Sequence, residues 1–208
     1  MGRLLLEQGC NTFIRFNDAI RIFRNINGKH EKSFESLVSS RKPFGFDSKI
    51  KVAEKEFANS VKIYSYPKNG FVSKKKISKN ISWVTKNKVM IAKAYGERGG
   101  LPYLVLGKPF VGEIGNCCSE TYLVIGQFNT EKEAQNVKSY IHTKVFRFLV
   151  LLKKNTQNAP KDVYSFVPMQ DFSEPWTDEK RYKKYGSTQD EITFIESMIR
   201  PMEVEVGK

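Results

Sequence analysis

The chain has 208 residues, of which 40% are hydrophobic and 12% aromatic, and 35 Lys and Arg residues against 22 Asp and Glu residues give a formal net charge of +13. Such a composition excludes a disordered chain, and the excess of basic residues points to an anionic partner rather than to a fold. Apolar segments stay well short of the ~20 residues that cross a bilayer, so we expect a cytoplasmic protein without a membrane partner.

Residues 12–39 are predicted to be helical. Apolar residues recur there at helical spacing, at Phe13, Phe16, Ile20, Phe23 and Ile26. Asn27-Gly28 is typical of a helix end. A second short helix is predicted over residues 31–39, which would bury Phe34, Leu37 and Val38 together.

Residues 40–118 form a β-rich basic insert. Alternating and β-branched segments predict strands at residues 61–66, 71–72, 81–84, 88–94 and 104–106. Three glycines and a proline between residues 96 and 102 predict a loop. We expect Cys117 and Cys118 to be partly buried loop residues. With Cys10, they make an odd count, which does not fit a disulfide framework.

Residues 119–208 form an α/β carboxy-terminal part. A strand is predicted at residues 122–125, and Thr130 with Glu133 forms a capping box that opens a helix over about residues 131–153. Thr177 and Gly186 bound a short helix, and a second capping box (Thr188, Glu191) opens a helix that Pro201 ends. The predicted fold class is α+β: a small, mostly antiparallel sheet flanked by N- and C-terminal helices, in a single domain spanning residues 1–208.

Motifs for catalysis are missing from the sequence. An amino-methyltransferase needs an Asn or Asp followed by Pro-Pro and an aromatic residue, together with a glycine-rich turn for the methyl donor, and neither motif occurs. A magnesium-dependent nuclease needs spaced carboxylates and a lysine, which the segments around Asp47 and Glu54 only approach. We therefore predict no catalytic residue, no metal ligand and no cofactor in this chain. A stand-alone magnesium-dependent DNA endonuclease is the alternative.

Basic residues gather in three segments, and no acidic residue lies between Phe71 and Gly96. Lysines there can neutralise phosphates, and the planar fork of Arg41 fits the O6 and N7 acceptors of guanine. A solvated loop tip, or a helix end that favours lysine, explains the same residues, and Trp83 fits either base stacking or a core position. The predicted DNA-contacting residues are Arg41, Lys42, Lys74, Lys75, Lys76, Lys79, Lys86, Lys88, Lys93, Arg98, Arg147, Lys153, Lys154, Asn155 and Gln157.

The order of segments resembles the carboxy-terminal target-recognition domain of adenine-specific DNA methyltransferases from bacterial restriction–modification systems. The resemblance covers most of the chain from about Leu37, and it is strongest across residues 39–46, which begin Ser-Ser-Arg-Lys-Pro-Phe-Gly, across residues 121–158 and across residues 163–202. It implies sequence-specific recognition of duplex DNA. It also implies a partner methyltransferase domain, with or without a nuclease domain, outside this sequence. That domain would use S-adenosylmethionine.

Overall fold

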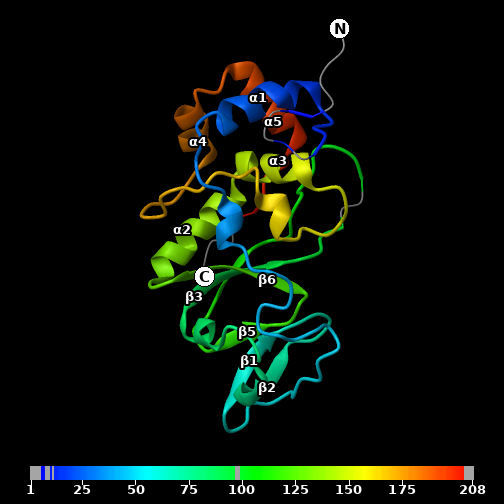
Figure 1. The fold of residues 1–208 in the computed structure, drawn as a ribbon, viewed down its shortest axis with the longest axis vertical. Helices are drawn as coiled ribbons and strands as arrows, with labels where there is room; N and C mark the ends of the chain where they lie inside the picture. The colour runs from blue at the N-terminus through cyan, green and yellow to red at the C-terminus, as the bar shows by residue number, and fades with distance from the viewer. Residues whose placement is uncertain (1–5, 8–9, 11, 97–98, 204–208) are drawn as a thin grey trace.

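The computed structural model describes residues 6–7, 10, 12–96 and 99–203, and it arranges them in three layers (Figure 1). Helices fill one end, a three-stranded sheet lies in the middle, and a second three-stranded sheet forms the other end. The α-helices are α1 (Asn17–Asn27), α2 (Glu131–His142), α3 (Lys144–Lys153), α4 (Asp178–Tyr185) and α5 (Gln189–Met198). The 3-10 helices are η1 (Phe34–Leu37), η2 (Lys74–Lys76), η3 (Ile81–Thr85) and η4 (Lys161–Tyr164).

The predicted α+β class is confirmed, with two small sheets in place of one. The strands are β1 (Ser60–Tyr64), β2 (Gly70–Ser73), β3 (Asn87–Ala92), β4 (Phe110–Gly112), β5 (Asn116–Cys118) and β6 (Tyr122–Phe128). The middle sheet has the order β4-β3-β6 and is antiparallel throughout, whereas the end sheet has the order β2-β1-β5, with β1 and β5 parallel.

The middle sheet is buried on both faces and joins two hydrophobic cores. Successive residues of a strand point to opposite faces, so Val89 and Ile91 of β3 pack with the helices, while Met90 packs with the end sheet. On β6, Ile125 and Val124 divide in the same way. The strands consequently contain continuous apolar runs, which is the pattern of a sheet covered on both sides.

The N-terminal helices are shorter than predicted. The helix over residues 12–27 begins only at Asn17, and Phe13 is 43% exposed before it. The second helix is the four-residue 3-10 turn η1, which Ser33 caps through the backbone N–H of Glu35. Phe34 is nevertheless fully buried, as the apolar spacing indicates.

Three predictions for the β-rich insert are wrong. Residues 81–84 form the 3-10 helix η3, and residues 104–106 are not a strand, because Val105 has a positive φ of 72°. Cys117 and Cys118 are not loop residues: they lie in β5 and are fully buried, since β5 pairs with β1 inside the second core. The sequence patterns at residues 61–66, 71–72 and 88–94 correspond to β1, β2 and β3.

The predicted helix over residues 131–153 is two helices. Thr143 has an extended conformation, with φ −61° and ψ 144°, so it ends α2 and caps α3. Its Oγ1 donates to the carbonyl of Tyr140 and accepts from the N–H of Phe146. Such a side chain satisfies backbone groups that a helix end would otherwise leave open.

The other C-terminal predictions hold. Both capping boxes are present, at the starts of α2 and α5, and α4 runs from its Thr177 cap to Gly186, which has the left-handed conformation. Within residues 6–7, 10, 12–96 and 99–203, none of the helices combines the length and apolar character needed to span a membrane.

Candidate nucleic-acid interface

Two of the predicted basic segments meet at the end of the molecule that contains β1, β2 and β5. The loop 41–46 lies against residues 77–80, because the N–H of Ser78 donates to the carbonyl of Phe44 and the amide of Asn80 donates to that of Pro43 at 2.8 Å. Gly45, at φ +93°, allows the close approach, since a Cβ there would lie 1.9 Å from the hydroxyl of Ser78. This contact unites the basic edge, which we define as Arg41, Lys42, Lys74, Lys75, Lys76 and Lys79.

The basic edge presents its lysines to solvent. Lys74, Lys75 and Lys76 form η2 directly after β2, and they and Lys79 are exposed. Residues 40–118 hold 16 of the 35 basic residues but only 5 of the 22 acidic ones, so most of the excess charge lies in this insert. Charges concentrated in this way attract polyanions over a distance set by the salt concentration.

Arg41 is held by a buried carboxylate. Its Nε donates to Oε2 of Glu120 over 2.6 Å, while Oε1 of Glu120 accepts from the N–H of Ser48. The Arg41 hydrogen bond is the main reason that the pKa of Glu120 falls to about 2. The Arg41 side chain stays 66% exposed, against 9% for Glu120. The guanidinium is therefore fixed through Nε with its side chain largely in water, an arrangement that also fits a purely structural ion pair.

Two predicted contact residues lie in the interior. Lys88 is completely buried, and its Nζ donates to the carbonyls of Lys86 and Glu113. Arg147 is also completely buried, and its guanidinium donates to the carbonyls of Leu104, Arg200 and His142. Because both side chains are buried, neither can reach a phosphate in this structure. The predictions failed because a sequence shows that a residue is charged but not whether its side chain points inward or outward.

The third basic segment lies apart from the basic edge and is mostly engaged within the fold. Lys153 donates to Ser165 at 2.6 Å and faces the ring of Phe166, and Lys154 donates to the carbonyls of Tyr95 and Val105. Lys93 lies beside this segment, as the hydrogen bond from the N–H of Ala159 to its carbonyl shows, and it is half-buried. Asn155 and Gln157 are exposed. The amine of Lys86 donates a hydrogen bond to the side-chain oxygen of Asn129. Arg98 lies outside the described residues.

A groove of about 520 Å³ lies at the middle of the molecule, and we call it the waist groove. It is lined by residues 36–40, Trp83, Gly126, Gln127 and Lys161. Residues 38–40 form one wall, and they are held against strand β6 by Ser39. The N–H of Ser39 donates to the carbonyl of Val124, and its hydroxyl accepts from the N–H of Val124. The sequence drew attention to residues 37–40 and to Trp83 separately, but it did not place them in one groove. Gln127 and Lys161 were missed because they lie far from the other lining residues in the chain.

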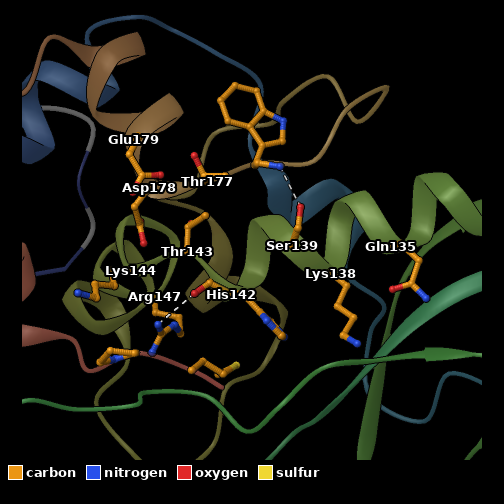
Figure 2. A pocket seen from close by; sticks show the side chains of 13 residues that line it. Gln135, Lys138, Ser139, His142, Thr143, Lys144, Arg147, Thr177, Asp178 and Glu179 are labelled. Carbon is orange, nitrogen blue, oxygen red and sulfur yellow. Dashed lines mark hydrogen bonds between the residues drawn. The ribbon is translucent and has the colours of Figure 1, made fainter. Parts of the chain in front are cut away.

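A second hollow, of about 470 Å³, lies where α2 ends and where α3 and α4 begin (Figure 2). Its polar groups serve the helix ends: Asp178 accepts from the N–H of Val145 at 3.1 Å, and Thr177 caps α4. Lys144 pairs with Glu196, and burial lowers the pKa of His142 to about 4, so its imidazole is neutral at pH 7. We interpret this hollow as a junction of helix ends.

The residues considered for a nuclease are dispersed. Asp47 accepts from the N–H of Lys49, and Glu54 pairs with Lys68, and both carboxylates are exposed. Among the described residues, no three His, Cys, Asp or Glu side chains come together in a group that could hold a metal ion.

No protein-family model matches the chain, and no curated protein matches it. The resemblance to target-recognition domains therefore stays a prediction, and the basic edge and the waist groove are the features of the molecule that suggest a function.

Proposed function

We propose that this chain is a sequence-specific duplex-DNA recognition module, and the basic edge is the observation that supports this most. Six basic residues from two distant segments meet on one end of the fold, four of them as exposed lysines. A cluster of exposed positive charges self-repels and gains free energy when it releases counterions from a phosphate backbone.

Within this proposal, the lysines and Arg41 have different tasks. Exposed lysines of η2 contact phosphates, which fixes affinity without reading sequence. Arg41 is oriented by Glu120, and an oriented guanidinium loses less conformational entropy when it pairs with guanine. In line with the resemblance, an adenine of the recognised DNA site would then be methylated by a separate domain that uses S-adenosylmethionine. The setting would be the cytoplasm of a bacterium.

Titration of a mixed-sequence duplex, followed by fluorescence anisotropy at several salt concentrations, tests the proposal. We expect log Kd to rise with log salt with a slope of about 0.9 for each phosphate contacted. Lys75→Ala should weaken binding to all sequences and lower this slope by about one. Lys183→Ala, which removes an exposed lysine of α4 at the opposite end, is the matched control and should change neither value.

Selection of duplexes from a random library tests the sequence-reading part. Arg41→Ala should relax one position of the selected site, at a cost of about 1–3 kcal/mol, whereas Lys75→Ala should leave the site unchanged. Absence of DNA binding at low salt would refute the proposal. Cleavage of plasmid DNA in Mg²⁺ that is lost on substitution of Asp47 or Glu54 would instead support the endonuclease.

A further inference from the structure

The waist groove lies beside the basic edge and opens between the two halves of the molecule. Its wall of residues 38–40 leads directly into Arg41 and Lys42. Trp83, which also lines the groove, belongs to η3, which follows Lys79. A strand of DNA that runs along the basic edge therefore passes the groove. The volume of about 520 Å³ falls within the range of small-ligand sites.

Trp83 gives the groove an aromatic wall. The ring packs edge-on against Phe44, with ring centroids 6.2 Å apart and an interplanar angle of 83°. It remains half-buried, and its accessible part lines the groove. An indole fixed at its edge by a buried phenylalanine keeps its orientation, and stacking of a nucleic-acid base on such a ring contributes about 1–3 kcal/mol.

Lys161 gives the groove its charge. It is the first residue of η4, which packs on η1 and α3, so its backbone position is fixed by the helical end. Among the described residues no carboxylate pairs with its amine, and no carboxylate lines the groove. Ser40 and Gln127, both exposed, add hydrogen-bonding groups to the lining.

From these contacts we infer that the waist groove binds one unpaired nucleotide of a DNA strand, with its base against Trp83 and its phosphate against Lys161. This inference rests on the proposed DNA recognition and deepens it, because it assigns a nucleotide site to residues that lie outside the basic edge. A fully paired duplex must open one base pair to fill the site, which costs a few kcal/mol. DNA that already contains an unpaired nucleotide avoids that cost.

Two labelled duplexes of the same sequence, about two helical turns long, test the inference. One is fully paired and the other carries a single unpaired adenine. We expect the 208-residue chain to bind the second duplex at least tenfold more tightly, an estimate that lies within the opening cost. The chain has two tryptophans, so Trp83 is the only one left in a Trp176→Phe background. Addition of the duplex with the unpaired adenine should quench its fluorescence, with the same Kd as the labelled duplex gives.

Lys161→Met and Trp83→Leu should each reduce the preference for the unpaired duplex to less than threefold, an estimate from the loss of one stacking or phosphate contact. Because Lys161 is a half-buried surface residue, its variant remains folded even if Trp83→Leu does not. Lys183→Met is the matched control and should keep the preference. Equal binding of the two duplexes, or binding without quenching of Trp83, overturns the nucleotide site and leaves the DNA proposal intact; no binding of either duplex refutes both.

Discussion

At the scale of single residues, Lys88 is a basic side chain that the fold turns inward. Its amine donates to the carbonyl of Glu113, and the side chain lies near the neutral thiols of Cys117 and Cys118. Burial lowers the pKa of Lys88 to about 8, compared with about 10.4 in an unfolded chain. Since the unfolded chain holds this proton more tightly, Lys88 destabilises the fold below about pH 8, and this penalty disappears as the pH rises to about 10.4.

Lys88→Met should remove this pH dependence. We expect the free energy of unfolding of the original chain, relative to the variant, to increase by roughly 3 kcal/mol between about pH 7.5 and pH 10.5. Urea unfolding across this range measures it. A constant difference between the two proteins would contradict the prediction. The variant should bind DNA with an unchanged salt slope, because Lys88 does not reach the surface.

Glu120 shows the opposite sign. Its pKa is lowered to about 2, chiefly by the hydrogen bond from Arg41, so its stabilising contribution is present above about pH 4.3 and is lost as the pH falls toward 2. Glu120→Gln should therefore lower the melting temperature at pH 7, by about 2–4 °C for each kcal/mol lost. The difference from the original chain should shrink in acid.

Glu54→Gln is the matched control for Glu120, because the pair of Glu54 and Lys68 is exposed on both sides. Exposed ion pairs contribute little to stability, and thermal melts should show a much smaller effect. Equal effects of the two substitutions would mean that burial of Glu120 is not what makes its ion pair matter.

At the scale of elements, Thr143 decides where one helix becomes two. Thr143→Ala removes the cap of α3 and the hydrogen bond to the carbonyl of Tyr140. We expect a loss of about 1–2 kcal/mol in the free energy of unfolding. Thr130→Ala removes the exposed cap of α2 and should cost no more than about 1 kcal/mol. Urea unfolding compares them, and a larger effect at Thr130 would contradict this ranking.

Helix boundaries set by local chemistry could be predicted from the sequence, and contacts between distant segments could not. The caps at Thr130, Thr177 and Thr188 depend on residues within one turn, and all are present. The break at Thr143 was missed because apolar residues continue at helical spacing on both sides of it. Strand β5 was missed because its three residues are stabilised by pairing with β1, more than fifty residues earlier.

For the candidate site, the sequence showed where basic residues are concentrated but not whether their side chains point to solvent or into the core. The exposed lysines of η2 lie in a turn, where side chains point to solvent, so they are on the surface, as a contact with DNA requires. Lys88 lies on a strand that is covered on both faces, and Arg147 lies on a helix whose residues 145–152 are all buried. Trp83 and Lys161 meet only through the fold, so no local pattern could have joined them.

At the scale of the whole molecule, the middle sheet makes the two cores depend on each other. Strands β3 and β6 supply residues to both, so neither core can lose its packing while the other keeps its full sheet. We expect one cooperative unfolding transition. Trp83 packs against the core of the end sheet and Trp176 against that of the helices. In each of the variants Trp83→Phe and Trp176→Phe, the urea midpoint from the remaining tryptophan should therefore coincide with the midpoint from far-UV circular dichroism of the same protein. Separate midpoints would indicate two independently unfolding parts.

The buried strand β5 also has a chemical consequence. Cys117 and Cys118 are fully buried free thiols, and burial raises the pKa of Cys117 to about 12 and that of Cys118 well above its usual value. Only the thiolate reacts with alkylating reagents, so the native protein shields both sulfurs twice, by exclusion of the reagent and by suppression of the reactive form. Alkylation therefore proceeds through molecules that have opened the interior, and its rate, followed by mass spectrometry, records how often the chain opens without any denaturant.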